Sequence, residues 1–111
     1  MPLVHGFSYG EHGVVRAAVD RENLVLKDFI ASELRGIGST PYREVRTAVE
    51  AVLRGEEAQD DLTYDAFSVE VGDPSTTIEY LHIEGRKLTV RTTDFLAVLI
   101  AYGEFVATNP A

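Results

Sequence analysis

The sequence contains no cysteine. Without cysteine the chain has no disulfide, no thiol nucleophile and no cysteine-based zinc site, which fits a reducing compartment. No apolar run approaches the roughly 20 residues that a membrane-spanning helix needs, so we expect no membrane insertion. Residues 1–9 have neither a basic start nor a long apolar run. No signal peptide is therefore predicted, and we expect a cytoplasmic protein.

Positive charge is scarce as well. The 111 residues include 10 Lys and Arg against 18 Asp and Glu, which gives a formal net charge of −8 at pH 7. A chain this acidic is repelled by phosphate backbones, so direct binding of nucleic acid is not expected. Basic proteins or cations are more plausible partners. An excess of acids also serves solubility alone, so the charge by itself assigns no function.

Motifs for catalysis and for cofactor binding are missing too. None of the serines lies in a nucleophile elbow, and no pair of carboxylates sits in an apolar setting that would mark an acid and base couple. There is no phosphate loop, dinucleotide fingerprint or zinc pattern. His5, Glu11 and His12 lie close in sequence, but their spacing matches no metal template. We therefore expect a protein without enzymatic activity, cofactor or metal.

The strongest structural signal is a predicted helix over residues 94–106. Eight consecutive apolar residues run from Phe95 to Tyr102, and helical spacing places Val98 and Phe105 on the same face as these two. A helix that is apolar on all sides must be covered on most of them. This helix is therefore predicted to lie at the centre of the core, with Thr92 or Thr93 capping its first turn.

The first half of the chain predicts a hairpin followed by two helices. Strands over residues 3–9 and 14–19 flank a glycine-containing turn, which is typical of a hairpin. A helix over residues 23–34 follows, with Asp20 as a candidate cap. A second helix opens at Thr40, a good N-cap followed by proline, and is expected to end near Gly55.

The second half predicts three strands before the last helix. They cover residues 62–71, 76–83 and 87–91. In the first of them the alternation of apolar residues changes phase, which predicts a β-bulge near Asp65–Phe67. The order strand, strand, helix, helix, strand, strand, strand, helix predicts a single α+β domain over residues 1–111. Its largely antiparallel sheet would have about five strands, with the helices packed on one face.

Acidic residues concentrate in residues 55–73, which hold seven acids and no base. A docking surface for a basic partner is one interpretation. A solvated loop that runs into a strand with a wet outer face is the other, and the sequence leaves both open. A calcium loop does not fit, because the acids lack the spacing and the central glycine of an EF-hand. The seven acids are Glu56, Glu57, Asp60, Asp61, Asp65, Glu70 and Asp73.

The C-terminal helix resembles the C-terminal signature of the YacL-like family of small bacterial proteins. The resemblance rests on Asp94-Phe95-Leu96, Val98-Leu99, Ala101-Tyr102 and Phe105-Val106, and more weakly on Gly13-Val14-Val15 with Arg16 and on Phe29 with Glu33. The chain departs from the family at Thr92-Thr93 and over residues 56–75. The resemblance implies a fold and no site. It gives an alternative function, a housekeeping or regulatory binding protein without enzymatic activity.

In size, charge and lack of cysteine the chain also resembles the immunity proteins of bacterial toxin systems, including contact-dependent growth inhibition. This resemblance implies an antitoxin-like inhibitor whose acidic surface masks the basic, nucleic-acid-binding cleft of a cognate nuclease toxin. Complementary charge would speed association and select the partner, and a buried aromatic anchor would slow release. With Tyr64 as the anchor, the predicted partner-binding residues are Glu56, Glu57, Asp60, Asp61, Tyr64 and Asp65. The sequence predicts no oligomeric state.

Overall fold

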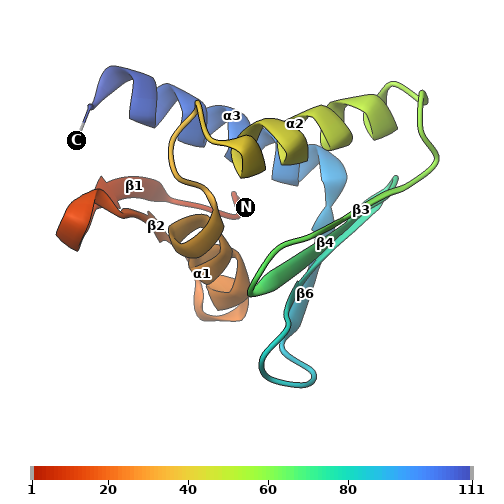
Figure 1. Ribbon diagram of the computed structural model, residues 1–111, viewed down its shortest axis with the longest axis horizontal. Coiled ribbons are helices and arrows are strands. Elements are labelled where there is room, and N and C mark those ends of the chain that lie inside the picture. Colours follow the sequence, from red (N-terminus) through yellow and green to blue (C-terminus); the bar gives the residue numbers. More distant parts are fainter. Residues whose placement is uncertain (1, 111) are drawn as a thin grey trace.

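Three α-helices and six strands build the part of the chain that the computed structural model describes, residues 2–110 (Figure 1). Two short 3-10 turns, η1 (Glu11–Gly13) and η2 (Arg21–Asn23), complete it. The α+β class and the antiparallel pairing are confirmed, although the strands number six and form two sheets. In chain order the other elements are β1 (Gly6–Tyr9), β2 (Val15–Ala18), α1 (Leu24–Glu33), α2 (Thr40–Leu53), β3 (Asp60–Thr63), β4 (Phe67–Val71), β5 (Ser75–Tyr80), β6 (Lys87–Arg91) and α3 (Thr92–Thr108).

The larger sheet is an antiparallel meander in the order β3-β4-β5-β6. Alternate side chains point to opposite faces of a strand, and one face of this sheet carries buried apolar residues such as Phe67, Val69 and Ile78. All three helices pack against this sheet, α2 on β3 and β4, and α1 and α3 on β5 and β6. The opposite face carries polar side chains. The helices therefore cover one face, as predicted.

Helix α3 contributes Tyr102, the largest fully buried side chain among the described residues, and its apolar run is buried in the core as predicted. Phe95, Leu99 and Tyr102 are completely buried, and each such side chain is worth roughly 1.5–3 kcal/mol of burial. The hairpin of β1 and β2 adds Phe7, whose ring packs edge-on against Tyr102 at a centroid distance of 6.0 Å. One side of α3 is not covered by the rest of the fold, and Ile100 on that side is 36% exposed.

The prediction of one bulged strand over residues 62–71 is wrong. The chain reverses there, and β3 and β4 pair as a hairpin in which Leu62 lies opposite Val69. The amide of Tyr64 donates to the carbonyl of Phe67 at 2.8 Å and closes the turn. A reversal shifts the apolar parity just as a bulge does, which is why the sequence pattern suggested the wrong cause.

Predicted caps and strand ends also need correction. Ser39, not Thr40, caps α2, and its Oγ accepts from the amide of Tyr42 at 3.3 Å. Thr92 opens α3 without a capping bond, because its hydroxyl is bonded to the Thr76 hydroxyl and to the carbonyl of Gly72. Asp20 makes no capping bond either. Strand β5 ends at Tyr80 rather than at residue 83.

Within residues 2–110, no helix combines the length and the apolar character that crossing a membrane requires.

Candidate protein-binding surface

The face of the larger sheet that the helices leave uncovered is polar and acidic. We call it the outer sheet face. Its three acids lie on successive strands, Asp61 on β3, Glu70 on β4 and Glu79 on β5. Serine and threonine fill most positions between them. The outer sheet face carries Asp61, Thr63, Ser68, Glu70, Ser75, Thr77, Glu79, Lys87, Thr89 and Arg91.

The register brings two of these acids directly opposite one another. Asp61 is the cross-strand partner of Glu70, and both side chains are exposed. Glu79 lies diagonally from Glu70, because Ser68 is its direct partner. Like charges that face each other across a strand pair are destabilising. The sheet therefore carries an unfavourable contact that a cation from outside would relieve.

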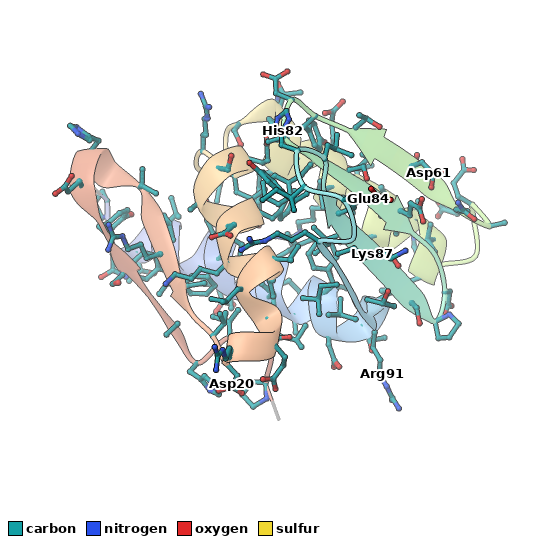
Figure 2. All side chains as sticks on the ribbon, turned by 90° about the horizontal axis from the view of Figure 1, so that it is seen from below. Asp20, Asp61, His82, Glu84, Lys87 and Arg91 are labelled. Carbon is teal, nitrogen blue, oxygen red and sulfur yellow. The ribbon has the colours of Figure 1, made fainter. Side chains whose placement is uncertain are left out.

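No base in the part of the chain that the structure describes relieves this contact. Among residues 2–110, the ion pairs are His5–Asp20, Arg46–Glu50, Arg54–Glu56 and Arg86–Asp28. Oδ1 of Asp61 accepts a hydrogen bond from the side-chain nitrogen Nε2 of Gln59 at 2.8 Å, which leaves the charge of Asp61 in place. On the outer sheet face, bases occur only on the far edge strand, where Lys87 lies directly opposite Glu79. Figure 2 shows Asp61 on β3 at one edge of the sheet, and Lys87 and Arg91 on β6 at the other.

Asp60 belongs to a different surface. It is half-buried and shares its parity with Leu62, which places it on the side of the sheet that faces α2. The hydroxyl of Tyr64 donates to Oε1 of Glu44 on α2 at 3.1 Å. Burial raises the pKa of Tyr64, and the negative charges of Glu44, Glu33 and Asp60 raise it further. Tyr64 therefore stays neutral and is held within the fold.

The six predicted contact residues consequently do not form one patch. Glu56 is bound by the guanidinium of Arg54 at 2.7 Å, and this contact lowers the pKa of Glu56. Glu57 and Asp65 are exposed, in the connection before β3 and in the turn after it. Asp60 and Asp61 project to opposite faces of the sheet. Of the six, Asp61 alone lies on the outer sheet face.

Glu70 and Glu79 were not among the predicted contact residues. Their outward position follows from the alternation with Val69, Val71 and Ile78, so that signal could have found them. Their position relative to Asp61 could not be found in this way, because it depends on the register of two hairpins. Glu33 and Glu44 were also missed, since only the packing of α1 and α2 brings them near Tyr64.

The histidine-containing N-terminal region shows no metal centre in the described residues. Nε2 of His5 lies 3.0 Å from Oδ1 of Asp20, so this histidine ties the start of the chain to the end of the first hairpin. Within residues 2–110, no three His, Asp or Glu side chains are arranged to hold a metal ion.

Comparisons with protein-family models, with curated proteins and with solved structures find no match to this chain. The YacL-like and immunity-protein resemblances therefore stay predictions, and the geometry of the outer sheet face is the basis for a functional proposal.

Proposed function

We propose that the chain is an antitoxin-like immunity protein. It binds a cognate nuclease toxin and covers the toxin's basic, nucleic-acid-binding cleft with the outer sheet face. The observation that carries the proposal is the unrelieved contact between Asp61 and Glu70, extended diagonally by Glu79. Asp61 and Glu70 offer a partner two neighbouring carboxylates, and Glu79 adds a third whose direct cross-strand partner is Lys87.

Two effects would favour binding on this face, one for the partner and one for this chain. A Lys or Arg of the partner placed between Asp61 and Glu70 would gain two charge-assisted contacts. It would also remove the repulsion that the free protein carries. Because Asp61 and Glu70 are exposed, their main effect should be on the association rate and on partner choice. Exposed charges are screened over about 8 Å at physiological ionic strength, so association should slow as salt is added.

The experiment is a pull-down with this protein as bait and the product of the adjacent reading frame as prey, at two salt concentrations, followed by a nuclease assay. We expect capture of a basic protein, weaker capture at high salt and loss of its nuclease activity. The variant D61K/E70K should bind at least about 100-fold more weakly, because like charges across an interface cost several kcal/mol.

The matched control is E22K/E104K. It makes the same change in net charge at exposed positions on η2 and α3, away from the outer sheet face. We expect it to retain most of the binding. Equal affinity of D61K/E70K and wild type would overturn the assignment of this surface. Absence of a captured partner, or a captured protein whose nuclease activity is unaffected, would overturn the immunity function.

A further inference from the structure

A cavity of about 590 Å³ lies at the other end of the molecule from the edge strand β3. Its walls come from the turn between β1 and β2, from the end of α1 and from the C-terminal part of α3. Figure 1 shows these three segments on one side, with β3 and the end of α2 on the other. Cavities of this size are typical of sites for small molecules.

Apolar side chains make up much of the wall. Val14, Leu34 and Val106 line the cavity from three different elements. The two tyrosine hydroxyls in the wall are already used within the fold. Tyr9 donates to the carbonyl of Asn109, and Tyr102 donates to the carbonyl of Leu34 at 3.0 Å. These bonds fix the shape of the cavity and leave other polar groups to meet a ligand.

The remaining polar groups are His12, Ser32 and Arg35, and the charged side chain among them is basic. No Asp or Glu lines the cavity, although acids outnumber bases by 18 to 10 in the whole chain. Neither His12 nor Arg35 takes part in an ion pair within residues 2–110. Arg35 carries a permanent charge, so this wall offers a cation that the fold has left without a counter-ion.

The backbone at the rim is held in an uncommon conformation. His12 has a φ of 59°, in the left-handed region that only a few per cent of residues other than glycine adopt. The turn imposes this conformation through two backbone hydrogen bonds. The amide of Gly10 donates to the carbonyl of Val14 at 2.7 Å, and the amide of Val14 donates to the carbonyl of Glu11 at 3.2 Å. The turn accounts for this conformation, which places His12 at the rim of the cavity.

We propose that this cavity binds a small organic anion. Its carboxylate or phosphate group would be held by Arg35, with His12 and Ser32 as further hydrogen-bond donors. A short apolar body would lie against Val14, Leu34 and Val106. This inference does not depend on the proposed immunity function, because the two sites share no residue.

The test is an NMR titration of the amide signals with four probes that share one chain length: hexanoate, hexyl phosphate, hexanol and hexylamine. We expect saturable shifts with the two anions at Gly13, Val14, Gly36 and Val106, and none at β3. The two anions compare a carboxylate with a phosphate head group. Hexanol measures the apolar contribution alone. Hexylamine tests the opposite possibility, that the cavity prefers a cation. This possibility arises because α1 ends at the cavity and a helix C-terminus favours cations.

The variant R35Q should weaken binding of the anions at least tenfold and leave binding of hexanol unchanged. R91Q is the matched control, because it removes one exposed arginine at β6. It should bind all probes as the wild type does. Stronger binding of hexylamine than of hexanoate at these amides, no shift with either anion, or equal loss in R35Q and R91Q would each overturn the proposal.

Discussion

At the scale of single residues, the close approach of α2 and α3 depends on Gly103. A Cβ atom at this position would lie 2.5 Å from the hydroxyl oxygen of Tyr42. That hydroxyl cannot easily move away. It donates to the carbonyl of Leu99 at 2.9 Å and accepts from Arg46 at 3.0 Å, and the Tyr42 ring stacks near Tyr102. The glycine is required by its neighbours rather than by its own backbone.

We therefore expect G103A to destabilise the fold. Alanine gains about 1 kcal/mol over glycine within a helix, but overpacking of a buried site costs typically 1–3 kcal/mol. Displacing the Tyr42 hydroxyl also weakens its two hydrogen bonds, one buried and one partly buried, each worth about 1 kcal/mol. The net loss should be about 1–2 kcal/mol in the free energy of unfolding, measured by urea denaturation.

The variant Y42F provides the control for this prediction. It removes the hydroxyl that the new methyl group would meet, and the next Tyr42 atom lies at 3.4 Å, an ordinary contact distance. In the Y42F background, G103A should therefore be neutral or stabilising. If G103A costs the same in both backgrounds, the Tyr42 contact is not the cause of the loss.

Residue-level patterns in the sequence were enough to identify the helices. The apolar stripe of α2, formed by Tyr42, Val45, Val49 and Val52, is buried as its spacing predicts. The cap was misplaced by one residue, because Ser39 and Thr40 are both good N-caps. Only the backbone conformation decides which of two adjacent hydroxyl residues takes that position, and the sequence does not contain it.

At the scale of elements, the hairpin of β3 and β4 shows where sequence reasoning stops. The alternation of apolar and polar residues indicates which side of a strand a residue faces, but it does not indicate where the chain reverses direction. The turn at Tyr64, Asp65 and Ala66 contains no glycine, proline or asparagine. Asp65 is its one residue typical of turns, and a single aspartate does not distinguish a turn from a bulge. The acidic stretch was visible in the sequence, but the split between Asp60 and Asp61 and the pairing of Asp61 with Glu70 depend on this turn.

The same hairpin gives a prediction about stability. The substitution D61K replaces a pair of like charges by a Lys–Glu pair in direct cross-strand contact. Opposite charges at such positions contribute roughly 0.2–1 kcal/mol, so D61K should raise the free energy of unfolding by about this amount. Urea denaturation at low salt is the measurement. Removal of the acceptor for Gln59 offsets little, because both side chains are exposed.

A double-mutant cycle with E70K tests the cause. Either single variant should be more stable than the wild type, whereas D61K/E70K places two lysines opposite each other and should lose the gain. A gain in the double variant equal to the sum of the two single gains would show that the carboxylates do not interact. In that case the outer sheet face would lose the feature on which its proposed role rests.

At the scale of the whole molecule, the two proposed sites have opposite charge and lie at opposite ends. The outer sheet face carries acids without cations near Asp61, and the lining of the cavity includes the cation Arg35 and no acid. The net charge of −8 predicted that the chain would have an acidic surface, which is the first of the two sites. It could not predict the second, because the cavity joins His12, Arg35 and Val106, which are far apart in the sequence and meet only in the folded chain.

The net charge also predicts how the whole fold responds to salt. Self-repulsion at −8 disfavours the compact state, and salt screens it over a distance of about 10 Å at 0.1 M. The free energy of unfolding at pH 7 should therefore rise between low salt and roughly 0.2 M sodium chloride, a range set by the same screening length.

D61K/E70K and E22K/E104K both bring the net charge to −4, since each exchange adds two positive charges. Both should show a smaller rise than the wild type, because self-repulsion belongs to the molecule and not to one pair. A salt response that E22K/E104K leaves unchanged would instead place the repulsion at the β3–β4 pair.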